Sequence, residues 1–138
     1  MRLSQAADYA LRAVLYLARQ GEGTIVDAQT ICEEESVPKR FLLKIFRELA
    51  QTKIIESYRG KNGGYALGID PAKITLRDVI EAVDGPIVVN RCLIDPAECN
   101  KINGNSCRTC TIHEALFDVQ QTIVNKLEEY TFADLLNS

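Results

Sequence analysis

The sequence predicts a mainly α-helical protein that carries one small β-hairpin and a long helix near its C-terminal end. Apolar residues recur at helical spacing through most of the 138 residues, whereas only two short runs have the composition of strands. A segment between residues 90 and 110 follows neither period and contains four of the five cysteines. A chain of this length is expected to form one domain with an appended element rather than two independent domains.

The first half of the chain is predicted to contain three helices. The first begins near Ser4 and ends at Gly21, because glycine commonly follows the last turn of a helix. Asp27 is a favourable N-cap for a short second helix that runs to Glu34. Pro38 marks the start of a third helix, since proline costs little in a first turn. Apolar residues then follow at helical spacing: Phe41, Leu42, Ile45, Phe46 and Leu49.

Two short strands are predicted after the third helix, at residues 54–58 and 64–67. The turn between them is rich in glycine and positive charge, so the pair predicts a hairpin with a basic tip. Helix, short helix, turn, basic helix and hairpin is the order of a winged helix-turn-helix, whose second paired helix enters the major groove of DNA. The predicted DNA-binding residues are all cationic: Lys39, Arg40, Lys44, Arg47, Arg59 and Lys61.

Charge is distributed unevenly along the chain, whose net charge is -3. Residues 36–67 hold seven basic and two acidic residues, a net +5, whereas residues 68–138 hold six basic and eleven acidic residues, a net -5. A basic face on an otherwise acidic protein is typical of local binding to nucleic acid. Charge alone would fit a solvated helix face better, so the prediction depends on the order of the elements.

Two further helices are predicted after the hairpin. Thr75, with Asp78 three residues later, gives a start that resembles a capping box to a helix through Ala82. Thr111 and Glu114 give a similar start to a long final helix that extends to about Tyr130. The apolar seam of this helix suits pairing with a second copy better than burial within one domain. It contains Ile112, Leu116, Val119, Ile123 and Leu127.

These elements divide the chain into four segments. We expect a winged helix-turn-helix DNA-binding domain at residues 1–84, a cysteine-rich loop at 85–110, a dimerisation helix at 111–130 and a C-terminal tail at 131–138. Pairing of the long helix in a homodimer would place two DNA-binding modules at half-sites one helical turn of DNA apart.

Composition disfavours several classes of protein. The chain has no run near the roughly 18 apolar residues of a membrane span, and its N-terminus lacks the features of a signal peptide. We therefore expect a cytoplasmic protein without a membrane partner. We do not expect an enzyme, because one histidine and no paired acid–base residues leave little to support catalysis.

Five cysteines in such a protein favour metal or redox use over structural disulfides. Cys32 lies among apolar residues, where a small core side chain is its expected role. The other four are separated by six, seven and two residues: Cys92, Cys99, Cys107 and Cys110. His113 follows the last of them by three residues. Thiolates at these spacings suit zinc or an iron–sulfur cluster about equally, and a Cys107–Cys110 disulfide is a third alternative.

Motifs along nearly the whole chain are shared with one known family. They lie at residues 8–18, 37–49 and 74–85 and, most specifically, in the hairpin, as Ser57-Tyr58-Arg59-Gly60-Lys61-Asn62-Gly63-Gly64-Tyr65-Ala66-Leu67. With these motifs the chain resembles the IscR/NsrR/CymR family of bacterial winged-helix, iron–sulfur-cluster-dependent transcriptional regulators. The resemblance implies a homodimeric repressor or activator that binds an operator with dyad symmetry, and of the two a repressor is expected.

The same resemblance implies a cofactor. Relatives with three cysteines in this loop hold a [2Fe–2S] or [4Fe–4S] cluster that senses cluster supply, nitric oxide or redox state. The candidate ligands in this chain are Cys92, Cys99, Cys107, Cys110, His113 and Asp8. Cys92 and Cys99 match the first two ligand positions, and either Cys110 or Cys107 supplies the third. The fourth ligand is His113, which is favoured because its spacing from Cys110 is local, or, as in NsrR-like relatives, an aspartate from the other subunit at the position of Asp8. If both Cys107 and Cys110 bind, all four ligands are cysteines.

Other functions compete with this one. A winged-helix regulator with a structural zinc, or with a thiol–disulfide switch, would use the same cysteines. A small iron–sulfur electron carrier belongs to a different class, but it would give the basic helix and hairpin no role. The CymR branch of the family lacks the cluster cysteines and is disfavoured for that reason.

Overall fold

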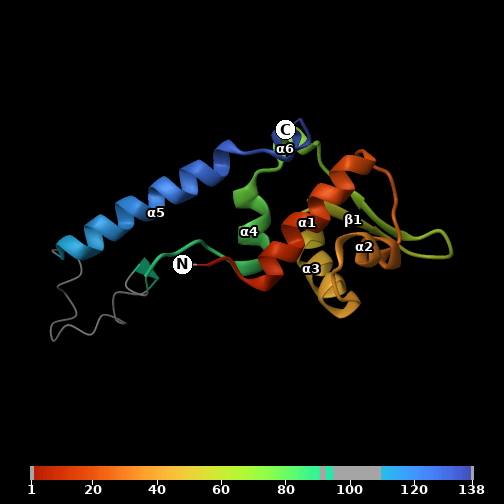
Figure 1. Cartoon of the computed structure of the whole chain (residues 1–138), viewed down its shortest axis with the longest axis horizontal. Coiled ribbons are helices and arrows are strands. Elements are labelled where there is room, and N and C mark those ends of the chain that lie inside the picture. The colour runs from red at the N-terminus through yellow and green to blue at the C-terminus, as the bar shows by residue number, and fades with distance from the viewer. Residues whose placement is uncertain (1, 91–92, 95–109, 138) are drawn as a thin grey trace.

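The structure, a computed structural model, describes residues 2–90, 93–94 and 110–137. Its elements along the chain are α1 (Gln5–Gln20), α2 (Ala28–Glu35), α3 (Lys39–Gln51), β1 (Ile55–Tyr58), β2 (Gly64–Leu67), the 3-10 helix η1 (Pro71–Lys73), α4 (Leu76–Asp84), α5 (Thr111–Glu129) and α6 (Phe132–Leu136). Most helices and the hairpin form one body, from which α5 extends to one side (Figure 1). The predicted fold class, mainly helical with a small antiparallel hairpin, is confirmed.

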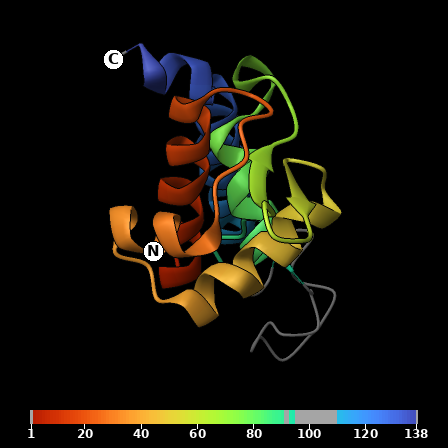
Figure 2. The ribbon, with the colours of Figure 1, turned by 90° about the vertical axis from the view of Figure 1, so that its right-hand side faces the viewer.

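Helix α1 lies in the middle of this body and packs against α3, α4 and α6. Val14 and Leu17 on α1 are fully buried, and they form the core together with Phe46 of α3. Figure 2 shows α3 crossing near one end of α1 and the hairpin beside it. The Ser4 hydroxyl accepts a bond from the Ala7 N–H at 3.0 Å and donates to the Asp84 carboxylate at 2.5 Å, which ties the start of α1 to the end of α4.

The hairpin pairs β1 with β2 in antiparallel register, with Ser57 opposite Tyr65. Tyr65 also exchanges two backbone hydrogen bonds of 2.8 Å with Val26, in the segment between α1 and α2. Its ring packs edge-on against Phe46 of α3, with ring centroids 4.6 Å apart. Tyr65 therefore attaches the hairpin both to the segment between α1 and α2 and to α3.

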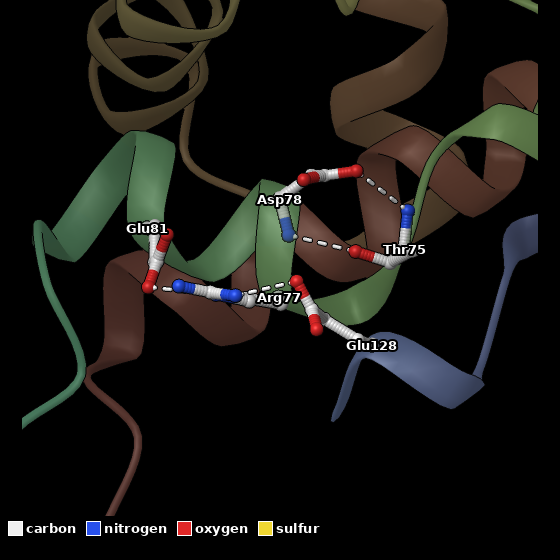
Figure 3. Close-up of polar contacts among 5 residues, drawn as sticks. All are labelled: Thr75, Arg77, Asp78, Glu81 and Glu128. Carbon is white, nitrogen blue, oxygen red and sulfur yellow. Dashed lines mark hydrogen bonds and ion pairs between the residues drawn. The ribbon is translucent and has the colours of Figure 1, made fainter. Parts of the chain in front are cut away.

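Helix α4 begins with a complete capping box (Figure 3). The Thr75 N–H donates to the Asp78 carboxylate at 3.0 Å, and the Asp78 N–H donates to the Thr75 hydroxyl at 3.1 Å. The capping box predicted for α5 is wrong. Thr111 is already helical, the N-cap is Cys110, and no side chain caps the helix there. Glu114 instead lies within the first turn of α5, where its negative charge interacts favourably with the positive end of the helix dipole.

The segment expected to be a C-terminal tail contains a packed helix. Thr131 and Asp134 form a second complete capping box at the start of α6, and Phe132 is fully buried in the main core. Backbone bonds from Leu76 N–H to Tyr130 at 3.0 Å and from Phe132 N–H to Ile74 at 2.9 Å join this segment to the start of α4. The chain after α5 thus returns to the body and holds the end of α5 in place.

Candidate nucleic-acid interface

Helix α3 turns one side to the core and the other to solvent. Leu42, Ile45, Phe46 and Leu49 are buried, because apolar residues at spacings of three and four share one face of a helix. Lys39, Arg40, Lys44, Arg47 and Gln51 are exposed. A helix held in this way by its apolar side leaves its cationic side free to enter a groove of DNA.

The turn that precedes α3 fixes its direction. Ser36 adopts a left-handed conformation, with φ of 53° and ψ of 45°, and ends α2. The next residue, Val37, is buried in the core. The Arg12 guanidinium of α1 donates to the Glu35 carbonyl at 2.8 Å, which satisfies a carbonyl at the end of α2. The tight turn between α2 and α3 is therefore supported both by packing and by a hydrogen bond from α1.

Helix α2 is capped at its other end by Asp27. The Asp27 carboxylate accepts bonds from the Thr30 hydroxyl at 2.6 Å and from the Thr30 N–H at 3.1 Å. These bonds lower the pKa of Asp27, since they favour the charged form. The N-cap predicted from the sequence is confirmed.

The tip of the hairpin brings Arg59 and Lys61 out to solvent. A side chain at Gly63 would put its Cβ 2.4 Å from the Tyr58 carbonyl, so the turn needs glycine there. On β1, the Tyr58 hydroxyl donates to the Glu56 carboxylate at 2.6 Å, and this bond raises the pKa of Tyr58. The Glu56 carboxylate is therefore bonded to Tyr58 on the same strand.

A hollow of about 310 Å³ lies between α3 and the hairpin. Arg47 from α3 and Arg59 from the hairpin both line it, beside Leu43, Ser57 and Tyr65. Two arginines that line one hollow from different elements suit the phosphates and groove edges of a nucleic acid, which an arginine contacts with several donors at once. Leu43 and Ser57 also line the hollow, and the sequence did not indicate this because neither residue is charged.

The six cations predicted to bind DNA are all exposed on this side of α3 and on the hairpin tip. None of them forms an ion pair with an acidic side chain in the part of the chain that the structure describes. Arg40 lies over the ring of Phe41, 5.0 Å from its centroid. Cations without acidic partners are available for phosphates, and each one that binds releases counterions from DNA.

Only part of the predicted cofactor site falls within the described residues. Cys92, Cys99 and Cys107 lie outside them. Cys110 and His113 lie at the start of α5 and in its first turn, and both are half-buried. Asp8 lies on α1, where its carboxylate is 3.2 Å from the Arg12 guanidinium and remains largely exposed. The described residues contain no group of three metal-binding side chains.

The predicted dimerisation seam on α5 divides into two sets. Ile112 and Val119 are exposed, whereas Leu116, Ile123 and Leu127 are half-buried within the protomer. Phe117, which the predicted seam did not include, is also exposed. No helix in the described part of the chain is long and apolar enough to span a membrane.

Comparison with known proteins identifies the family. The family described as "Rrf2: Iron-dependent Transcriptional regulator" matches residues 3–138. A protein of Aquifex aeolicus, assigned as an HTH-type transcriptional regulator, is 30% identical over 137 residues, which cover 99% of this chain and 92% of that protein. A protein of Mycobacterium tuberculosis with the same assignment is 36% identical over 87 residues. That match covers 63% of this chain and 54% of the relative, so it spans about half the length of the relative.

Solved structures show the same fold. IscR of T. potens has a TM-score of 0.74 at 21% identity, with 99% of this chain and 87% of that chain covered. CymR of B. subtilis, named as its global cysteine regulator, has a TM-score of 0.76 at 23% identity, with 98% and 95% covered. The family and its members are named as transcriptional regulators, not as enzymes.

Proposed function

The chain belongs to the Rrf2 family of transcriptional regulators, and from that premise we propose that it is a homodimeric repressor whose affinity for a dyad-symmetric operator depends on an iron–sulfur cluster. The observation that carries the DNA-binding part is the hollow between α3 and the hairpin, which Arg47 and Arg59 line from two sides. In this proposal α3 enters the major groove, and the hairpin tip reaches the adjacent minor groove. The proposed site of action is DNA in the cytoplasm.

The proposed cofactor is held by cysteines around the start of α5. Cys92, Cys99 and either Cys107 or Cys110 are the proposed thiolate ligands, with one ligand that is not cysteine. Soft thiolates suit iron–sulfur clusters, and the family description names iron dependence. When bound, the cluster supplies iron that reacts with oxidants or nitric oxide. The described residues fit this role, since a thiol and an imidazole lie one turn apart at the start of α5.

Control of DNA binding follows from linkage in this proposal. In this proposal the cysteines that precede α5 would hold the cluster, and α5 joins the two winged-helix modules. Loss of the cluster then changes operator affinity only by the difference in contact energy between the two states. The proposal therefore predicts that the forms of the protein with and without the cluster differ in operator affinity.

A thiol–disulfide switch is the second candidate, and a structural zinc is the third. The fold of CymR, of which an oxidised form is known in Staphylococcus aureus, resembles this chain with a TM-score of 0.72 at 21% identity. Iron and sulfide assays of protein purified without oxygen separate the cluster from both alternatives. An iron–sulfur electron carrier is excluded, because the chain belongs to a family of transcriptional regulators.

The DNA-binding part is tested with Arg47→Ala and Arg59→Ala. Binding is measured to an operator that the wild-type protein selects from random duplexes. If the arginine reads a base edge, its loss should weaken this binding by about 1–3 kcal/mol. If it contacts phosphate only, its loss should reduce the salt dependence of binding. Arg19→Ala, in the last turn of α1, is the matched control. Unchanged affinity in low salt for both hairpin and α3 variants would contradict the proposed docking.

The cofactor part is tested by anaerobic reconstitution of Cys107→Ala and Cys110→Ala. One of the two should lose the visible absorbance of the cluster, and the other should keep it. Cys32→Ala is the control, because Cys32 is buried in the helical core and burial raises the pKa of its thiol, which disfavours the thiolate that binds metal. Zinc without iron in the wild-type protein would replace the proposed cofactor by a structural metal.

A further inference from the structure

In the described part of the chain, α5 packs against α4, and the buried residues of α5 are Gln120 and Val124. Its C-terminal end is held by the backbone bonds around Thr131 and by the buried Phe132. Further along, the Val89 N–H donates to the buried amide oxygen of Gln120 at 3.1 Å. Between these two points lies an ion pair in which Glu128 of α5 meets Arg77 of α4.

Arg77 joins two acidic side chains from different helices (Figure 3). Its Nε donates to Glu81 at 3.0 Å, one turn further along α4, and its terminal nitrogen donates to Glu128 on α5. The bonds with Glu81 and Glu128 raise the pKa of the guanidinium, which is charged at physiological pH in any case. A planar guanidinium has donors in fixed directions. The bond to Glu81 orients the Arg77 guanidinium on α4, and the bond to Glu128 then favours one position of α5 relative to α4.

The Arg77–Glu128 contact lies at the junction of α4 and α5. Arg77 lies between Thr75 and Asp78, whose capping box holds the first turn of α4. Thr75 also pairs with Thr131 in an isolated β-bridge, so α4 starts beside the end of α5. The guanidinium therefore has a firm base on α4 and contacts α5 close to the point at which α5 is anchored.

The ion pair does little for stability. The side chains of Arg77, Glu81 and Glu128 are 33%, 32% and 48% exposed, and ion pairs at such sites contribute little to folding because water screens them. A small change in the direction of α5 would nevertheless move its far end by several ångströms. The 19 residues of α5 span about 28 Å at 1.5 Å per residue. A rotation of about 10° at the anchored end would therefore move the far end by roughly 5 Å.

We propose that the Arg77–Glu128 ion pair sets the angle of α5 to the winged-helix body, and so sets the spacing of operator half-sites that the dimer accepts. The inference rests on the proposed function, because it needs a homodimer that binds DNA through two winged-helix modules. Recognition helices of such dimers meet half-sites about 34 Å apart, so a displacement of a few ångströms moves one of them out of register. Arg77 is a positioning residue here and does not contact DNA.

The test compares two glutamates that share one arginine. Glu128→Gln removes the contact between helices, and Glu81→Gln removes the contact within α4. Full-length protein is purified anaerobically, and each variant is titrated with the duplex that wild type selects from a random pool. Further duplexes have one or two base pairs inserted or deleted between the half-sites. Thermal unfolding and sedimentation establish that each variant is folded and dimeric.

Glu128→Gln and Arg77→Gln should weaken binding to the preferred spacing on the order of tenfold and bring the affinities for all spacings close together. Glu81→Gln should keep the wild-type preference. Lys126→Gln should keep it too, because Lys126 pairs with Glu129 on α5 itself, at 2.9 Å. Equal loss at every spacing, an unchanged preference in Glu128→Gln, or the same change in Glu81→Gln would each overturn the proposal. If wild type selects no duplex with dyad symmetry, the proposed function fails instead.

Discussion

The proposed dimerisation seam of α5 gives a testable prediction at Val119. This side chain is 48% exposed in the protomer, so a change there alters the surface of α5 with little effect on the core. Ile123 is a weaker choice, since it is half-buried within the protomer and its replacement would affect folding and pairing together. Val119→Ala and Val119→Asp therefore test the seam as an interface between two copies of the chain.

The size of the effect follows from exposed area. Valine to alanine deletes two methyl-sized groups, each contributing about 0.8 kcal/mol when fully buried. Because 48% of Val119 remains exposed in the protomer, pairing would bury about half of that contribution, or roughly 0.8 kcal/mol per protomer. A twofold interface contains each residue twice, so Val119→Ala should cost about 1.6 kcal/mol and raise the dimer Kd just over tenfold. Val119→Asp should cost more, since it places an unpaired charge in an apolar interface.

Sedimentation equilibrium over a range of protein concentrations measures this Kd directly. Asn125→Asp is the matched control, because it adds the same charge on an exposed side of α5 away from the seam. Thermal unfolding of the dissociated variants should still show a folded winged-helix body. If Val119→Asp remains dimeric at the concentrations at which wild type does, the seam is not the interface, and the reasoning from exposed area is refuted.

Three further predictions concern stability and the cofactor. Phe132→Ala should destabilise the chain by about 3–5 kcal/mol in chemical denaturation, and a loss below about 1 kcal/mol would mean that α6 does not belong to the core. The lowered pKa of Asp27 contributes stability that is present above the ordinary carboxyl pKa and is lost as pH falls through the lowered value. Asp27→Asn keeps a capping oxygen that does not titrate, so the free energy of unfolding of this variant should fall less than that of wild type as the pH is lowered. Identical pH profiles would show that Asp27 does not contribute to the pH dependence of stability. Of the two candidates for the fourth cluster ligand, His113→Ala should change the visible and Mössbauer spectra of the reconstituted protein more than Asp8→Ala, whereas wild-type spectra for both would indicate ligation by cysteine alone.

Local signals in the sequence were sufficient for the DNA-binding elements. The order of apolar residues in α3, the cap at Asp27 and the glycine-rich turn of the hairpin each act over a few residues, and the structure contains all three. Such features depend on neighbours along the chain, so a single sequence carries them. The predicted exposure of the cations follows from the same periodicity, because the apolar side of α3 can face only the core.

Features that join distant segments were not predictable in this way. A helix as short as α6 has too few residues for a period, although Thr131 and Asp134 repeat the spacing of Thr75 and Asp78. That spacing was the available signal for α6. The partner of Arg77 gave no such signal. Glu128 lies 51 residues away, and a sequence with many acidic residues does not indicate which one the fold brings near.

The two ends of α5 have different roles in the proposed mechanism. The C-terminal end is anchored at Thr131 and Phe132, whereas the N-terminal end begins at Cys110, a candidate cluster ligand. In the proposed mechanism, a change at the cluster would rotate α5 about its anchored end. The Gln120–Val89 bond lies between these ends and joins α5 to the segment that leads into the cysteines. A buried amide side chain costs stability unless it is hydrogen-bonded. The bond from Val89 to Gln120 therefore favours one position of this segment on α5. It would oppose a rotation of α5 that separates the two residues.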